Sequence, residues 1–292
     1  MLKPSTGETL ADLREEIDRI DQAMHRLLME RGEIIDRLIH VKAKQGNGSA
    51  FRPSREADMM RRLVERHQGL LPLDTVETIW RIIISTFTFV QSNYAVHADI
   101  SGGDAVMRDC CRFHFGFTVP FNPHPDVASV ISAVKASKGD LGLVRIEAGP
   151  AAGPWWTELA APDAPKIIAR LPFVERPDHP AGLPLFVVAT PPAEATARDV
   201  VILSVTIDRW QEDLPARLAE QNIEILDKSE AGGKVSLMLA ASRPDGVAAQ
   251  NDTIDERLRK VLHDRGIDAQ STEIGSHAAR FDLALRRCEA AQ

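Results

Sequence analysis

The sequence has few aromatic residues and no long apolar run. Phe, Trp and Tyr make up 5% of its 292 residues, and tyrosine occurs once. No apolar stretch reaches the roughly 20 residues that a membrane-spanning helix needs. The N-terminus also lacks the apolar core of a secretory signal. We therefore expect a cytoplasmic protein without a membrane partner.

Cysteine is also scarce, and acidic residues outnumber basic ones by 42 to 35. There are three cysteines: the adjacent Cys110 and Cys111, and Cys288. An odd number of cysteines in a long chain does not indicate a disulfide framework. Adjacent cysteines also lack the spacing of a tetrahedral metal site. The net charge of −7 argues against a nucleic-acid partner, because phosphates favour basic surfaces. We expect neither a metal nor a cofactor.

The remaining composition is that of an ordinary globular protein, with 44% hydrophobic and 26% charged residues. By residue content and hydrophobic periodicity, the sequence divides into three regions. Residues 8–96 have helical periodicity, residues 97–192 combine Gly and Pro with short strand-like runs, and residues 198–280 alternate strand and helix patterns. A linker at 191–198 separates the last two. We predict a multidomain α + α/β protein with these boundaries.

The first region predicts three helices. In the first of them, apolar residues recur every three or four positions: Leu10, Leu13, Ile17, Ile20, Met24, Leu27, Leu28, Ile34, Ile35, Leu38 and Val41. Thr9 or Asp12 would cap this helix, and Asn47-Gly48-Ser49 would end it. A second helix would start near Pro53, and Asp74 would cap a third.

The length of the first helix favours a dimer. About 35 residues span roughly 50 Å, which two shorter helices cannot cover. A second copy of the long helix would bury its apolar face. We therefore expect an intertwined homodimer.

Polar residues interrupt the apolar faces at Arg14, Arg31, Lys42 and Gln91. A buried cation needs an anion nearby, because burying it alone costs several kcal/mol. Ion pairs are one interpretation, and their candidate partners are Asp18, Asp21, Glu30 and Glu56. A dianionic ligand that satisfies all four polar residues together is the other.

The ordered motifs of this region resemble the all-helical chorismate mutases of the bacterial type. The resemblance covers residues 8–95 and rests on Leu13-Arg14-Glu15-Glu16-Ile17-Asp18, Leu27-Leu28-Met29-Glu30-Arg31, Val41-Lys42, Arg52-Pro53-Ser54-Arg55-Glu56, Ile79-Trp80-Arg81-Ile82-Ile83 and Gln91. It implies that Arg31, with Arg14 of the partner subunit, binds the two carboxylates of chorismate. Lys42 and Gln91 would donate hydrogen bonds to its ether oxygen.

The resemblance implies further pocket residues. Glu56 would accept a hydrogen bond from the ring hydroxyl, and Arg55 would line the same pocket. Four residues before Gln91 the family has a small or hydroxylic residue, whereas this chain has Phe87. Its ring would either narrow the pocket or pack in the core.

The second region resembles, more faintly, the first lobe of prephenate dehydratases. The resemblance rests on His114-Phe115-Gly116, residues 134–149 and Leu185-Phe186-Val187-Val188. Pro184 and Leu185 stand where that family has a catalytic Thr-Arg pair. Only about 28 residues separate Trp156 from Pro184, which is too few for a second lobe of roughly 100 residues. We expect a one-lobe α/β domain without dehydratase activity.

Other features of this region have simpler interpretations. The spacing of His114, His124 and His179 suits no common metal site. The Gly149–Pro154 stretch is typical of a turn, because it lacks the Lys and hydroxyl of a phosphate loop. We expect Trp155 and Trp156 to pack in a core or an interface.

The third region predicts the order strand, helix, strand, strand, helix, strand, which is ferredoxin-like. It resembles the ACT regulatory domains that follow dehydratase domains. Those domains bind phenylalanine through two motifs, whose places here read Asp213-Leu214-Pro215 and Lys228-Ser229-Glu230. Because neither motif is kept, we do not expect phenylalanine to be an effector.

Two functions remain open at this point. The first is a chorismate mutase of aromatic amino-acid biosynthesis, with chorismate as its substrate. The alternative is a non-catalytic, degenerate paralogue that binds an aromatic-pathway metabolite or a partner enzyme. The polar residues favour the enzyme, whereas Phe87 and the altered C-terminal motifs favour the alternative.

Overall fold

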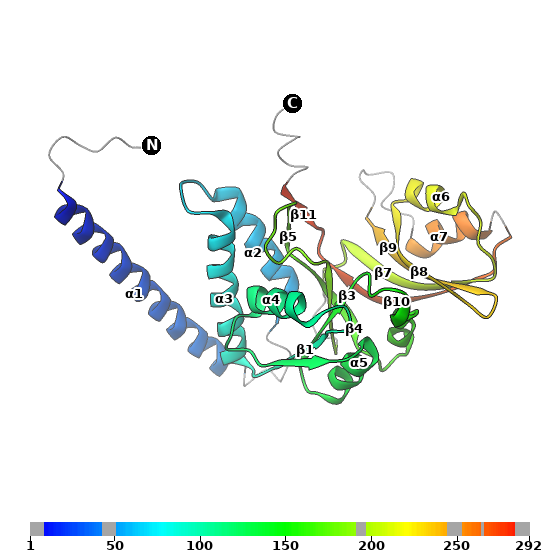
Figure 1. Ribbon diagram of the computed structural model, residues 1–292, viewed down its shortest axis with the longest axis horizontal. Helices are drawn as coiled ribbons and strands as arrows, with labels where there is room; N and C mark the ends of the chain where they lie inside the picture. Colours follow the sequence, from blue (N-terminus) through cyan, green and yellow to red (C-terminus); the bar gives the residue numbers. More distant parts are fainter. Residues whose placement is uncertain (1–8, 43–50, 191–196, 244–252, 264–265, 284–292) are drawn as a thin grey trace, which may run out of the picture. The chain divides into compact units, whose positions relative to one another are not determined.

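The computed structural model describes residues 9–42, 51–190, 197–243, 253–263 and 266–283. The chain divides into two compact units, Met1–Asn47 and Gly48–Gln292. The first unit contributes helix α1, and the second contributes all the other elements (Figure 1). No helix among the described residues is both long and apolar enough to cross a membrane.

Helix α1 (Leu10–Lys42) is a single helix of 33 residues. Thr9 caps it: the Thr9 hydroxyl accepts from the Asp12 amide at 3.3 Å, and the Asp12 carboxylate accepts from the Thr9 amide at 2.9 Å. This reciprocal pair is a capping box, and it confirms the predicted start of the helix. The predicted break at Asn47-Gly48-Ser49 lies outside the described residues.

Helices α2 (Pro53–Arg66) and α3 (Leu73–Gln91) follow. Pro53 occupies the first turn of α2, as predicted, where its missing amide costs no hydrogen bond. The predicted cap of α3 is wrong. The helix starts after Pro72 without a side-chain cap, and the carboxylate of Asp74 pairs with Arg176 instead.

The second unit is built on one nine-stranded sheet of order β2-β1-β3-β6-β4-β10-β7-β9-β8. Its first five strands are β1 (Val96–Asp99), β2 (Phe121–His124), β3 (Leu141–Arg145), β4 (Lys166–Leu171) and β6 (Leu185–Ala189). Strands β2 and β3 run parallel to β1, while β6 is antiparallel to both β3 and β4. A short strand, β5 (Val174–Glu175), pairs with β11 (Phe281–Asp282) in a separate two-stranded sheet.

Helices α4 (Asp104–Phe115) and α5 (Val127–Ala136) pack against opposite faces of this part of the sheet. Successive residues of a strand point to opposite faces, so in β6 Val187 joins the core on the α4 side and Phe186 the core on the α5 side. The 3₁₀ helices η1 (Pro150–Ala152) and η2 (Trp155–Ala160) follow β3. Both tryptophans of η2 are buried in the α5-side core, as expected.

The C-terminal part has the predicted ferredoxin-like order. Its elements are β7 (Val200–Ile207), α6 (Leu214–Glu220), β8 (Ile223–Ala231), β9 (Lys234–Ser242), α7 (Ile254–His263) and β10 (Ala269–His277). The strands pair antiparallel in the order β10-β7-β9-β8. Helices α6 and α7 cover one face (Figure 1), and η2 packs against the other.

Strands β4 and β10 join the two parts of the sheet through Gly275 and Ile167. A Cβ atom on Gly275 would lie 2.1 Å from the Ile167 carbonyl oxygen, so only glycine allows this approach. The regions predicted as separate domains therefore share one sheet. Their predicted boundaries stay a prediction.

The core of α2 and α3 is continuous with that of the sheet. Met60 and Leu63 of α2 and Ile84 of α3 belong to the same buried cluster as Phe115 of α4 and Leu171 of β4. Residues on both sides of the predicted boundary at residue 96 thus belong to one apolar core. These two helices pack on the α/β part of the chain.

Candidate active site

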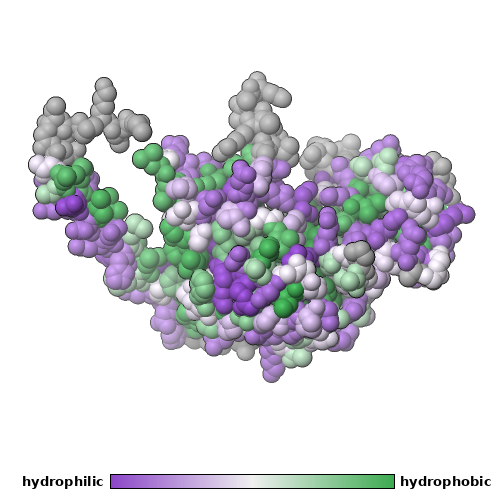
Figure 2. Space-filling model, viewed as in Figure 1, coloured by the Kyte–Doolittle hydropathy of each residue, from purple (hydrophilic) through white to green (hydrophobic). Residues whose placement is uncertain are grey.

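Helix α1 carries three of the predicted site residues. Arg14 is exposed, Arg31 is half-buried, and Lys42 is the last residue of the helix. The same helix exposes a long row of large apolar side chains (Figure 2): Leu10, Leu13, Ile17, Ile20, Met24, Leu27, Leu28, Met29, Ile34 and Val41.

Phe87 and Gln91 lie one turn apart on α3, and both are half-buried. The Gln91 side-chain amide donates to the Phe87 carbonyl oxygen at 2.9 Å. A glutamine side-chain amide carries two protons, and this bond uses one of them.

Arg55 and Glu56 are neighbours with opposite environments. Arg55 is exposed, whereas Glu56 is only 4% exposed. The Glu56 carboxylate accepts from Arg81 Nη1 at 2.7 Å. Burial raises the pKa of the Glu56 carboxyl, and the Arg81 guanidinium opposes that shift. The predicted contact of Glu56 with the ring hydroxyl stays a prediction.

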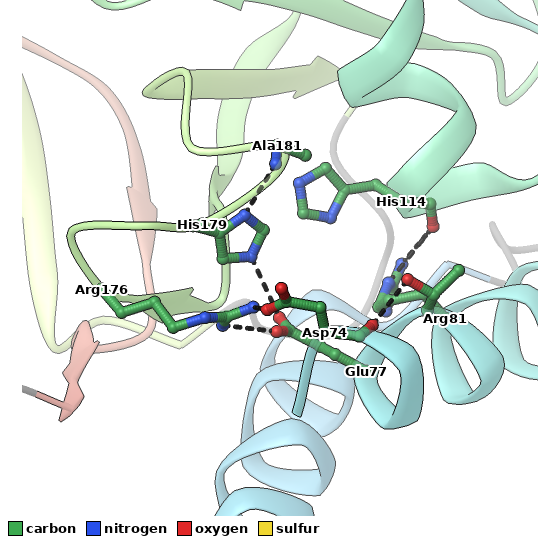
Figure 3. Close-up of polar contacts among 8 residues, drawn as sticks. Asp74, Glu77, Arg81, His114, Arg176, His179 and Ala181 are labelled. Carbon is green, nitrogen blue, oxygen red and sulfur yellow. Dashed lines mark hydrogen bonds and ion pairs between the residues drawn. The ribbon is translucent and has the colours of Figure 1, made fainter. Parts of the chain in front are cut away.

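Arg81 is a residue to which the sequence assigned no role. It is 1% exposed, and its Nη2 and Nε donate to the His114 carbonyl oxygen at 2.9 and 3.2 Å (Figure 3). That carbonyl belongs to the last turn of α4, where a cation is favourable. The Arg81 guanidinium also lies over the Phe173 ring, 5.0 Å from its centroid. The signal was present, because Arg81 interrupts an apolar run as the other site residues do.

Glu77 is a second buried charge that sequence reasoning missed. Its side chain is fully buried, and its two oxygens accept from Arg176 Nη1 at 2.6 Å and from His179 Nε2 at 3.3 Å (Figure 3). Arg176 Nη2 also contacts Asp74. The spacing of Glu77 and Arg81 suggests an ordinary helix-surface pair, yet each binds a partner outside α3.

His114 lies beside this network. Its ring stacks with that of His179 at a centroid distance of 6.2 Å and an interplanar angle of 21°. Burial lowers the pKa of His114 well below its usual value, and the charge of Arg81 adds to the shift. His124 lies elsewhere and contacts His97 at 2.8 Å. No three metal-ligating side chains converge within the part of the chain that the structure describes.

The structure thus brings together Phe87 with Gln91 and Glu56 with Arg81. Arg14, Arg31 and Lys42 belong to the other compact unit. The arrangement of the predicted pocket as a whole stays a prediction.

Comparison with known proteins bears on this set of residues. The family model of chorismate mutase type II matches residues 13–92. This part of the chain is a chorismate mutase domain. All seven residues predicted for the site fall within the matched segment, including Arg14 near its beginning and Gln91 near its end.

A curated relative extends the similarity beyond this domain. The bifunctional chorismate mutase/prephenate dehydratase of Aquifex aeolicus is 29% identical over 144 residues, which cover 48% of this chain and 39% of that protein. The corresponding protein of Neisseria gonorrhoeae is 26% identical over 146 residues, with 50% and 39% coverage. The chain spans about two fifths of the length of the curated relatives it matches.

Among solved structures, similarity is weaker. A protein described as GqqA, a novel type of quorum quenching acylase, matches with a TM-score of 0.43 and 14% identity, covering 67% of this chain and 98% of its own.

Proposed function

We propose that the protein rearranges chorismate to prephenate as a homodimer. The observation that carries this proposal is the match of residues 13–92 to the chorismate mutase family, with the ordered polar residues inside it. In this proposal Arg31 and Arg14 of the partner subunit bind the substrate carboxylates. Lys42 and Gln91 donate to the ether oxygen.

These residue types suffice for the reaction. The rearrangement breaks and forms bonds within one molecule, and it needs no nucleophile, cofactor or net proton transfer. The site must hold a compact conformer of the substrate, which is an orientation effect. It must also stabilise negative charge that grows on the ether oxygen, for which Lys42 and Gln91 supply donors.

The apolar face of α1 supports the dimer. Leu10, Met24 and Val41, spread along the helix, are each more than half exposed. A contiguous apolar face on a helix of 33 residues is typical of helices that pack against a second copy. A cytoplasmic location is part of the proposal, because the reaction named for the relatives belongs to biosynthesis.

Phe87 favours the non-catalytic alternative, as do the altered C-terminal motifs. Phe87 stands where the family has a small residue, and its carbonyl oxygen holds one amide proton of Gln91. A protein with an obstructed pocket would bind a pathway metabolite or a partner enzyme without turnover.

An assay of chorismate turnover by the 292-residue chain distinguishes the two functions. We expect the chain to consume chorismate and to form prephenate in equal amounts, which chromatography of timed samples would measure. A folded dimer without turnover that binds chorismate by calorimetry would support the alternative. In that case, restored turnover in Phe87→Ser would identify Phe87 as the obstruction.

A further inference from the structure

Helix α3 is bound to the α/β part of the chain by a row of charged side chains, of which Glu77 and Arg81 are buried (Figure 3). The three charged residues on the helix are three or four positions apart, so they share one face. We call the following residues the α3 anchor: Asp74, Glu77, Arg81, His114, Arg176 and His179.

Arg176 binds α3 with both ends of its guanidinium. Its Nη1 lies 2.6 Å from the Glu77 carboxylate, and its Nη2 contacts Asp74 one helical turn earlier. A planar fork that spans two carboxylates at a fixed separation restricts both the rotation of the helix and its position along its axis.

His179 holds the other oxygen of Glu77. The His179 Nδ1 accepts from the Ala181 amide at 2.9 Å, so the ring proton is on Nε2 and points to Glu77. Both oxygens of this fully buried carboxylate are therefore bound. Glu77 cannot move unless the segment that carries Arg176 and His179 moves with it.

The same helix carries Phe87 and Gln91, about three and four turns beyond Glu77. We propose that Arg176 and His179 are positioning residues for the mutase site, because they set where α3 presents these two side chains. The inference rests on the proposed function and extends it. Both residues lie after the segment 13–92 that matches the mutase family, so the second region would take part in the mutase reaction.

The test compares two Arg→Lys variants of the full-length protein. Arg176→Lys keeps the charge but cannot span Asp74 and Glu77. Since a misplacement of about 1 Å can cost roughly a hundredfold in rate, we expect kcat per folded site to fall about tenfold or more. KM should change less than about threefold, because the carboxylate-binding arginines are on α1.

Arg198→Lys is the matched control. Arg198 also binds a carboxylate with both ends of its guanidinium: its two terminal nitrogens lie 2.6 and 2.8 Å from the oxygens of Glu273. This pair is exposed, and both of its residues come after the second region of the chain. We expect its kcat and KM to equal those of the wild type. If Arg176 has a purely structural role, Arg176→Lys will have a lower melting temperature but an unchanged kcat per folded site. That result would overturn the proposal.

Two further measurements complete the test. His179→Gln retains a donor for Glu77 and should keep more activity than His179→Ala. Hydrogen exchange of peptides covering residues 83–91 should be faster in Arg176→Lys than in Arg198→Lys, and equal rates would contradict the inference. Without chorismate turnover by the wild type, the proposed function fails. The exchange rates would then show separately whether the anchor holds α3.

Discussion

The Glu56 carboxylate lies 2.7 Å from Arg81 Nη1, and both side chains are almost completely buried. The pair links α2 to α3, and Arg81 continues to the last turn of α4 through the His114 carbonyl. The Arg81 guanidinium therefore links the three helices α2, α3 and α4.

The first prediction concerns this pair. Replacing Arg81 with Met would leave the Glu56 carboxylate buried without its cation, so we expect the free energy of unfolding to fall by about 3–5 kcal/mol. Urea denaturation would measure it. Arg61→Met is the control, because its pair with Asp58 is exposed and such pairs contribute at most about 1 kcal/mol. Equal losses in the two variants would show that the burial of Glu56 has no consequence.

The second prediction concerns Lys42. As the charged donor to the ether oxygen, it would act where negative charge develops in the transition state. Lys42→Ala should lower kcat roughly a hundredfold or more, the usual effect of losing one such donor. Arg37→Ala removes an exposed cation from the same helix and should leave kcat unchanged. Turnover by folded Lys42→Ala at the wild-type rate would remove Lys42 from the site.

The third prediction tests whether Arg14 acts across the dimer. Arg14→Ala and Lys42→Ala should each be nearly inactive alone. After subunit exchange, a mixed dimer has one site with both defects and one with neither. About a quarter of all sites should then be intact, and activity should recover in proportion. If verified exchange restores nothing, Arg14 acts within its own chain.

The fourth prediction is a loss of stability in acid. His277 is 2% exposed, and burial lowers its pKa to about 4. The unfolded chain, in which a His pKa is about 6.5, therefore takes up the proton first as the pH falls. The free energy of unfolding should decrease between about pH 6.5 and pH 4, by up to about 3 kcal/mol from this residue.

Urea denaturation at several pH values would measure this dependence. His277→Gln should flatten it, leaving the part due to His114, whose pKa is also lowered by burial. The matched control is His263→Gln, which replaces an exposed histidine of α7. A pH dependence that survives unchanged in His277→Gln would contradict the assignment.

The fifth prediction is that the protein neither dehydrates prephenate nor binds phenylalanine. Between η2 and β6 the chain forms only β4 and β5, with no second lobe among these residues, all of which the structure describes. At the second effector motif, Lys228 pairs with Glu230 at 2.9 Å within β8. Phenylpyruvate above the acid-catalysed background, or saturable phenylalanine binding by calorimetry, would overturn this prediction.

The sequence alone determined the features that depend on local order along the chain. Apolar spacing and the Thr9–Asp12 pair defined α1, and the alternation of strand and helix patterns defined the ferredoxin-like part. The ordered polar residues also identified the mutase segment, which the family comparison confirmed. These features are readable because neighbouring residues, or a fixed order of motifs, specify them.

Only the tertiary structure decided which distant groups meet. Arg81 interrupts an apolar run of the sequence, but periodicity cannot show that Glu56, 25 positions away, is its partner. Nor did it show that Glu77 binds Arg176, 99 positions later. It gave no sign that Gly275 and Ile167 would join the two parts of one sheet. A helical pattern reports which side of a helix faces inward, whereas the identity of the opposing charge depends on how the whole chain packs.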